Sequence, residues 1–488
     1  MANNEVTTIL VIDQGTSSSR ALLFEPSGCL IAQAQTPIKT FYPQSGWVEQ
    51  DAEKLFLTTL ACCKKVLKQT DCPPSSLAIT NQRETTIVWQ RSTGKPLYPA
   101  IVWQDKRTQL WCEQKVESTE LVRQKTGLLL DPYFSASKIH WILQEVPEAY
   151  RLSLQGDLCF GTVDSWLIFK LTAGQYHLTD MTNASRTLLF NIHEQKWDQT
   201  LLSLFNIPES ILPTVKPCHA FFGETSLLGT NIPILGVAGD QQASLIGQFG
   251  LEKGAVKTTL GTGCFMMANT AHQVVKSEHN LISTIGYNLF DETHFALEGS
   301  IFHAGSIINW MRDNLCLFKE INELNQLDYE YLQPLLYFIP AFNGLSAPHW
   351  LKKSQAAFIG LEKHHTDKNL LQAGLESIAW QNYDLLMAME QDGVTPQYLN
   401  VDGGISNNLN FLQRLADLTQ ISIKPAVQAE STALGVMLIA AIELGLIKDK
   451  AQLLALKENQ HTIKPRMSKA LHSQYHQGWL QAIQSISH

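Results

Sequence analysis

Short apolar runs separated by turn residues open the chain. Residues 7–12 form a run rich in β-branched side chains, without a helical period, and the run stops at the turn cluster 13–16. A second apolar run, 21–24, follows at once and ends at the turn 26–28. Two strands joined in this way predict a β-hairpin.

Three later segments carry the spacing of amphipathic helices. In 51–67 the apolar residues recur mostly three or four positions apart, which predicts a helix with one buried face. The same spacing marks 298–314 and 369–391. We therefore expect a helix to follow the hairpin, and two more helices in the second half of the chain.

The second half repeats the opening pattern weakly, because the run 256–260 leads to Gly261-Thr262-Gly263 much as the first run leads to Gly15-Thr16. A chain of 488 residues also exceeds what one hydrophobic core usually holds. We expect two α/β domains, residues 1–250 and 251–488, with the boundary near the glycines of 250–254.

Composition narrows the class of protein. Hydrophobic residues make up 44% and charged residues 17% of the chain, as in globular proteins. A net charge of -8 argues against nucleic-acid binding and favours a small-molecule substrate. Nine scattered cysteines without a C-x-x-C pair argue against a disulfide framework or a zinc site. With no leader-like start and no membrane-length apolar run, we expect a cytoplasmic protein that does not span a membrane.

The turn 13–20 collects a carboxylate, a glycine, four hydroxyls and a cation. Glycine exposes backbone N–H groups that can cradle phosphate, Arg20 can neutralise it, and Asp13 can hold Mg²⁺. An ordinary hairpin turn uses the same residue types, so both interpretations stay open here. The glycine turns at 261–263 and 402–404 are each weak evidence for a ligand site, because glycine serves tight turns more commonly than ligand contacts. No Walker motif occurs in the chain.

Taken together, these turns and several further motifs resemble the FGGY carbohydrate kinase family, within the actin and hexokinase ATPase superfamily, and especially its members that act on glycerol. The resemblance runs from Val11 to about Gly445, and the matching stretches are 13–20, 46–51, 80–85, 100–105, 131–134, 179–180, 182–187, 238–243, 261–265 and 402–404. It implies two RNase H-like domains with mixed central sheets, an interdomain cleft and closure by a hinge.

The resemblance also implies a reaction, the ATP-dependent phosphorylation of glycerol to sn-glycerol 3-phosphate. It makes Asp240 the general base, a role that suits phosphoryl transfer because the attacking hydroxyl must lose a proton. From the residues alone, a β-turn or a helix N-cap is the favoured interpretation of Gly239-Asp240. The residues implied to bind glycerol are Arg83, Glu84, Trp103, Tyr133, Asp240, Gln241 and Phe265.

For ATP, the resemblance implies phosphate contacts from Thr16, Ser17, Ser18, Arg20 and Thr262, and adenosine contacts from Gly305, Asn309, Gly404 and Asn408. Asp13 would anchor Mg²⁺. A homo-oligomer, either a dimer or a tetramer, is implied as well.

Other interpretations remain beside this one. The chain could phosphorylate another small polyol or ketose, or serve as a non-catalytic nucleotide-binding scaffold. Arg83-Glu84 could be a solvated surface pair, and Trp103 and Phe265 could be plain core residues.

The sequence departs from the family pattern in two places. Within 344–360, the family usually has Gly at Ser346, Asp at Leu351 and Arg-Gly at Gln355-Ala356. None of the residues implied to act in the reaction lies in this stretch, so the departure concerns local loop packing and not the chemistry. Asn231 stands where family members inhibited by fructose bisphosphate carry Arg. Because Asn cannot neutralise a phosphate, we expect no such inhibition, and activity measured with added fructose bisphosphate tests this.

Overall fold

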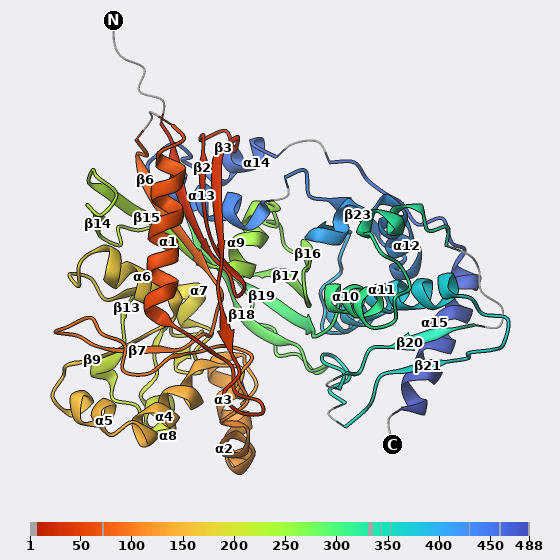
Figure 1. Ribbon diagram of the computed structural model, residues 1–488, viewed down its shortest axis with the longest axis horizontal. Helices are drawn as coiled ribbons and strands as arrows, with labels where there is room; N and C mark the ends of the chain where they lie inside the picture. Colours follow the sequence, from red (N-terminus) through yellow and green to blue (C-terminus); the bar gives the residue numbers. More distant parts are fainter. Residues whose placement is uncertain are drawn as a thin grey trace, which may run out of the picture. The chain divides into compact units, whose positions relative to one another are not determined.

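The computed structural model describes residues 7–70, 73–329, 335–342, 344–351, 353–428, 430–457 and 460–486. The chain forms two compact units (Figure 1). The first comprises Met1–Phe249, Ser283–Phe295 and Glu430–Lys457, and the second comprises Gly250–Ile282, Ala296–Ala429 and Glu458–His488.

A six-stranded sheet forms the centre of the first unit. Its strand order is β14 (Glu224–Thr225), β15 (Ile232–Gly239), β6 (Ser76–Asn81), β1 (Ile9–Gln14), β2 (Ser18–Phe24) and β3 (Leu30–Pro37). β1 pairs antiparallel with β2 and parallel with β6, and β15 pairs parallel with β6. The mixed sheet and the hairpin at the start of the chain confirm those two predictions.

Helix α1 (Ala52–Leu67) packs on β1, β2 and β3. The Asp51 side chain accepts a hydrogen bond of 3.0 Å from the Lys54 N–H, which caps the helix where the sequence predicts its start. Its buried face includes Leu55 and Val66 and joins one core cluster with strand residues such as Leu10. The helical period therefore fixes both the helix and the face that it buries.

Helix α13 (Ser431–Glu443) lies against β15, β6 and β1 and crosses α9 (Asp240–Gly247). The crossing is close because both helices present glycine. A Cβ on Gly435 would lie 1.8 Å from the Ala243 carbonyl oxygen, and one on Gly247 would lie 1.9 Å from that of Ser431. Only glycine fits at these two positions, so the sequence dictates this approach.

The remaining elements of the first unit are short or lie around the sheet. They are β4 (Thr40–Phe41), β5 (Glu49–Gln50), β7 (Ile87–Gln90), β8 (Ala100–Ile101), α2 (Gln109–Gln114), α3 (Thr119–Thr126), α4 (Ser135–Glu145), α5 (Pro147–Leu154), β9 (Leu158–Gly161), α6 (Val163–Leu171), β10 (Leu178–Asp180), α7 (Met181–Ala184), β11 (Phe190–Asn191), β12 (Lys196–Trp197), α8 (Gln199–Phe205), β13 (Thr214–Lys216) and α14 (Lys450–Ala455).

A second mixed sheet carries the order β18 (Ile282–Leu289), β19 (Glu292–Ile301), β17 (Cys264–Ala271), β16 (Val256–Leu260), β22 (Tyr398–Asp402) and β23 (Ser422–Pro425). Residues 283–295 of its first two strands are grouped with the first unit. β16 pairs antiparallel with β17 and parallel with β22, which repeats the β1, β2 and β6 pattern. The weak sequence repeat between the two halves therefore corresponds to a repeated pattern of strand pairing. Other elements here are α10 (Gly305–Asp313), β20 (Tyr337–Ile339), β21 (Ala357–Ile359), α11 (Asp367–Gln391), α12 (Leu409–Thr419) and α15 (Lys469–Ser485).

One predicted helix is wrong in its first part. Residues 298–301 continue strand β19, and α10 begins only at Gly305. Gly299 packs tightly within the strand, since a Cβ there would lie 2.5 Å from Leu385 Cδ2. The apolar spacing of 298–304 suits either structure, and tertiary packing decides for the strand. The helix predicted over 369–391 is confirmed as α11.

Every cysteine in the described ranges is a free thiol, and Cys72 lies outside them. Over the same ranges, the structure contains no helix with the length and apolar character needed to cross a bilayer.

Candidate active site

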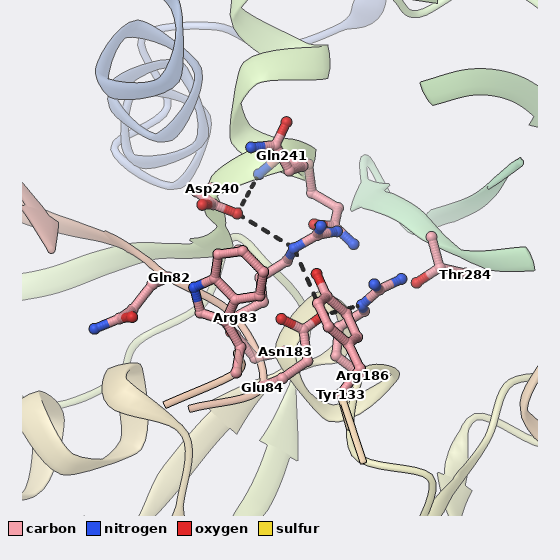
Figure 2. Close-up of polar contacts among 12 residues, drawn as sticks. Gln82, Arg83, Glu84, Tyr133, Asn183, Arg186, Asp240, Gln241 and Thr284 are labelled. Carbon is pink, nitrogen blue, oxygen red and sulfur yellow. Dashed lines mark hydrogen bonds and ion pairs between the residues drawn. The ribbon is translucent and has the colours of Figure 1, made fainter. Parts of the chain in front are cut away.

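Asp240 stands at the first position of α9, directly after strand β15, and Gly239 is the N-cap. Its side chain is 30% exposed. Oδ1 accepts a 2.7 Å hydrogen bond from the Gln241 N–H and lies 3.2 Å from Arg83 Nε (Figure 2). The carboxylate is thus held in place by its neighbours while it remains partly open to solvent.

Arg83 and Glu84 follow strand β6 in a buried turn. Their side chains are only 2% and 1% exposed, which rules out the solvated surface pair. Arg83 Nη1 donates to Gln242 Oε1 at 3.1 Å. Glu84 Oε1 accepts from Arg186 Nε at 2.6 Å (Figure 2). Glu84 adopts a left-handed backbone with φ of 61°, which is uncommon for a residue with a side chain. The surrounding ion pairs hold this strained turn.

Two aromatic rings accompany these charges. Trp103 and Tyr133 are half-buried and meet edge to face, with ring centroids 5.5 Å apart. Trp103 Nε1 donates to Thr16 Oγ1 at 2.9 Å, which connects the aromatic pair to the β1–β2 turn. Neither ring is a fully buried core residue.

Lys138 fixes the backbone that carries Tyr133. Its ammonium donates to the carbonyl oxygens of Pro132, Tyr133 and Phe134 at 2.5, 2.8 and 3.2 Å. Burial lowers the pKa of this amine to about 8. The lysine therefore serves as a structural support for one wall of the site.

Asp13 is the next-to-last residue of strand β1, and it lies near two other carboxylates. Burial raises its pKa to about 6; Arg20 acts against this, and the Asp240 and Glu430 charges add to it. Arg20 Nη1 lies 3.3 Å from Asp13 Oδ2, and Arg20 Nη2 pairs with Glu430 Oε2. Oxygen ligands of this kind are what Mg²⁺ prefers, so the donor set fits that ion.

The β1–β2 turn between these groups is tight. The Gly15 N–H donates to the Ser18 carbonyl at 3.0 Å, which leaves Ser17 exposed at the tip and Thr16 half-buried. Ser18 is buried, and its hydroxyl accepts from Gln35 Nε2 at 2.9 Å. The hydroxyl of Ser17 is thus the most accessible of the three.

In the second unit, the 261–263 turn packs on the start of α10. The Gly305 N–H donates to the Gly261 carbonyl at 2.9 Å, and the Ser306 N–H donates to that of Thr262 at 3.0 Å. A Cβ on Gly305 would lie 2.6 Å from the Gly261 oxygen, so this approach requires glycine. Thr262 and Asn309 are exposed, whereas Phe265, in β17, is half-buried.

The 403–408 segment follows β22. Gly403 has φ of 98°, and open space surrounds the position of a Cβ on exposed Gly404. Asn408 is buried; its Oδ1 caps α12 through the Phe411 N–H at 2.9 Å, and its Nδ2 donates to the Leu324 carbonyl at 2.9 Å. Gly404 therefore has the accessibility of a ligand contact, and the Asn408 amide is engaged in packing.

Several residues around the acid and arginine were not singled out from the sequence, although they lie in stretches that carried the resemblance. Gln242 holds Arg83 and also donates to the Ile285 carbonyl at 3.1 Å. Arg186 holds Glu84, and Asn183 bonds to Asn81. A buried polar residue has no sequence signal of its own, so only their place within a matching stretch could have singled out Gln242, Arg186 and Asn183.

Comparison with known proteins identifies the family. The N-terminal domain of the "FGGY family of carbohydrate kinases" matches residues 8–247, and the C-terminal domain matches residues 256–444. The chain belongs to the FGGY family of carbohydrate kinases. The similarity extends to full-length relatives. "Glycerol kinase" of Ectopseudomonas mendocina is 46% identical over 98% of both chains, and "Glycerol kinase 1" of Pseudomonas aeruginosa is 45% identical over the same shares.

Two solved kinase structures match this chain over nearly its full length. Plasmodium falciparum glycerol kinase, determined with ADP, has a TM-score of 0.91 at 33% identity and covers 99% of this chain and 98% of its own. Xylulose kinase of Lactobacillus acidophilus has a TM-score of 0.88 at 20% identity, with the same coverage, and supports the fold alone.

Proposed function

We propose that this FGGY kinase transfers the terminal phosphoryl group of ATP to glycerol, giving sn-glycerol 3-phosphate and ADP. The observation that carries the proposal is the partly exposed Asp240 carboxylate beside the buried Arg83 and Glu84. Similarity at about 45% identity to full-length proteins named glycerol kinase supports glycerol as the acceptor.

In this proposal, the buried ion pairs recognise a compact triol. Glu84 accepts hydrogen bonds from glycerol hydroxyls and Arg83 donates to them, while Trp103, Tyr133 and Phe265 contact the carbon edge and Gln241 adds an amide. Asp240 accepts the proton of the attacking hydroxyl as the oxygen–phosphorus bond forms and the bond to ADP breaks. A rigid site discriminates between acceptors, because each buried polar group that a wrong substrate leaves without a hydrogen bond costs binding affinity.

For the nucleotide, we assign the phosphates to Thr16, Ser17, Ser18, Arg20 and Thr262, and the adenosine to Gly305, Asn309, Gly404 and Asn408. Asp13 would hold Mg²⁺, which, when bound, neutralises phosphate charge. Arg20 contributes a fixed positive charge next to it. The proposed base and the proposed polyol contacts other than Phe265 belong to the first unit, and the four proposed adenosine contacts belong to the second unit.

A coupled ADP-release assay tests the reaction. With Mg²⁺ and ATP, we expect glycerol to give turnover well above the rates for xylulose, erythritol and glyceraldehyde, which represent the other polyol and ketose kinases. ADP release that is faster with one of those three acceptors than with glycerol would reassign the substrate. Nucleotide binding without turnover on any acceptor would favour a scaffold.

The assembly belongs to the same proposal. We expect a homodimer or homotetramer, as the family resemblance implies, and light scattering of the purified protein measures its mass.

A further inference from the structure

A wholly buried carboxylate, Asp180, links the two segments that carry the proposed polyol site. It ends strand β10 and caps the short helix α7, accepting from the N–H groups of Thr182 at 2.8 Å and Asn183 at 3.0 Å. Both of these residues are themselves fully buried. The side chains of Thr182 and Asn183 also donate to the Asp180 carboxylate, and each of them bonds to a further strand as well.

The first connection runs to Asp240. The Thr182 hydroxyl donates to Asp180 Oδ2 at 2.6 Å and accepts from the Gly239 N–H at 2.9 Å. Gly239 immediately precedes Asp240 and is the N-cap of its helix. A single hydroxyl therefore connects a buried carboxyl group to the backbone next to the proposed base.

The second connection runs to Arg83 and Glu84. Asn183 Nδ2 donates to Asp180 Oδ1 at 2.8 Å and to Asn81 Oδ1 at 3.1 Å, and Asn81 Nδ2 donates back to Asn183 Oδ1 at 3.0 Å. Asn81 ends strand β6, two residues before Arg83. Figure 2 draws Asn183 together with Arg83, Glu84 and Asp240.

Gly239 has to sit accurately for a second reason. A Cβ at this position would lie 2.8 Å from Arg83 Cδ, so the glycine backbone packs directly on the arginine that contacts Asp240. With no side chain to hold it, Gly239 depends on its backbone contacts, and the Thr182 hydroxyl accepts its N–H. Movement of Gly239 would shift the direction of the Asp240 carboxylate and disturb Arg83.

We propose that Thr182 is a positioning residue for phosphoryl transfer: its hydroxyl, oriented by Asp180, fixes the Gly239 N–H and thereby the direction of Asp240. This inference rests on the proposed phosphorylation of glycerol. Displacement of a reacting group by a fraction of an ångström lowers the rate more than it lowers binding, because binding is spread over many other contacts. We therefore expect loss of the Thr182 hydroxyl to lower kcat and to leave KM nearly unchanged.

Three variants separate this role from general stability. Thr182→Val keeps the shape and removes the hydroxyl, whereas Thr182→Ser keeps the hydroxyl. Thr187→Val is the matched control, because Thr187 is also buried and its hydroxyl also donates and accepts, to the Ala184 carbonyl at 2.7 Å and from the Leu189 N–H at 3.2 Å, but its partners do not include Gly239. In the ADP-release assay we expect Thr182→Val to lower kcat about ten-fold, with KM for glycerol and ATP within about twofold of the parent. Thr182→Ser and Thr187→Val should stay within about threefold in kcat.

Hydrogen exchange of the amides around Gly239 gives a readout that does not depend on turnover. We expect exchange there to be faster in Thr182→Val than in the parent, Thr182→Ser or Thr187→Val. A folded Thr182→Val with parental kcat would overturn the inference, as would a Thr182→Ser with the same loss. If Thr182→Val does not fold, Thr182→Cys, whose sulfur is a weak acceptor, takes its place.

Failure of the proposed function has a different signature. If the parent protein releases no ADP with glycerol, the function is wrong, and the exchange comparison still decides whether Thr182 holds Gly239. Unchanged exchange in Thr182→Val would then remove the positioning role as well.

Discussion

The charged side chains that surround Asp240 on the side of Arg83 are buried, whereas the Asp240 carboxylate itself is partly accessible. Arg83, Glu84 and Arg186 are almost fully removed from solvent, whereas the Asp240 side chain is 30% exposed. Buried charges are costly unless they are paired, so each one restricts the geometry of the next. The result is an accessible carboxylate on an immobile support, as a base for an incoming hydroxyl requires.

Asp240→Asn is the most direct test at this scale. The amide preserves size and polarity but is a far weaker proton acceptor, so we expect turnover with glycerol to fall by about 100-fold or more. ATP binding, measured by calorimetry, should change little. Near-parental turnover would remove Asp240 from the role of base.

Asp13 gives a prediction about pH. Its pKa of about 6 in the folded chain exceeds the ordinary value of 3.8, so between about pH 4 and 6 the folded chain holds a proton that the unfolded chain releases. The free energy of unfolding therefore falls as pH rises through that window. Asn does not titrate. We expect Asp13→Asn to raise the free energy of unfolding by about 2 kcal/mol at pH 7.5, and by much less at pH 4.

Denaturant unfolding without Mg²⁺ or nucleotide, at both pH values, measures this difference. A variant less stable than the parent at pH 7.5 would show that the Arg20 contact outweighs the burial of the charge. Lower turnover is expected alongside the added stability, because the carboxylate proposed to hold Mg²⁺ is lost.

At the scale of elements, the crossing of α9 and α13 controls where Asp240 begins its helix. Gly435→Ala is the test. Alanine normally favours a helix over glycine by up to about 1 kcal/mol, but here its Cβ would lie 1.8 Å from the Ala243 carbonyl oxygen. We expect the sign to reverse, with a loss of about 2–4 kcal/mol in the free energy of unfolding and a lower kcat, because α9 must move.

Thr432→Ala, in the same helix at a half-buried position, is the control for that substitution. Its unfolding midpoint should lie close to that of the parent. If Gly435→Ala is as stable as Thr432→Ala, the crossing of α9 and α13 accommodates the added methyl group, and the expected clash is wrong.

The loop that departs from the family pattern is held by other contacts. His349 Nε2 lies 2.8 Å from Asp384 Oδ2, and the same oxygen accepts from Trp479 Nε1 at 2.9 Å. The Ser346 hydroxyl accepts from the Phe302 N–H at 3.3 Å. These bonds tie the loop to α11 and to Phe302, which directly follows β19, and the Trp479 bond joins α15 to the same α11 carboxylate.

At the scale of the molecule, each compact unit is assembled from separated stretches of chain. The first unit needs Ser283–Phe295 and Glu430–Lys457, which follow residue 250 in sequence. A fragment of residues 1–250 would lack α13, which packs on β15, β6, β1 and α9. We expect that fragment to bind a hydrophobic dye and to unfold without a cooperative transition, whereas the full chain unfolds cooperatively.

Calorimetry and dye binding on the fragment and the full chain measure this contrast. A sharp transition in the fragment would mean that its sheet is stable without α13. Adding residues 251–488 in trans is the complementary experiment, and restored cooperativity is the expected result.

Local patterns were enough to predict several elements. The hairpin at the start of the chain follows from two short apolar runs bounded by turn residues, and α1 and α11 follow from the helical period, all of which depend on neighbouring residues. The start of α10 did not follow, because the packing of Gly299 against Leu385 makes 298–301 a strand. The sequence also did not predict that the Asn408 side chain caps α12 and binds the Leu324 carbonyl.

The sequence by itself determined the short-range structure and, through resemblance, the family and the identity of the acid and arginine. Tertiary structure alone decided which of these residues meet. Arg83 and Asp240 lie 157 positions apart, and they come within 3.2 Å because β6 and β15 pair in parallel and end at the same edge of the sheet. Likewise, Thr182 reaches Gly239 only after β10 and α7 have packed beside β15. Contacts of this kind depend on the whole sheet, which no local pattern encodes.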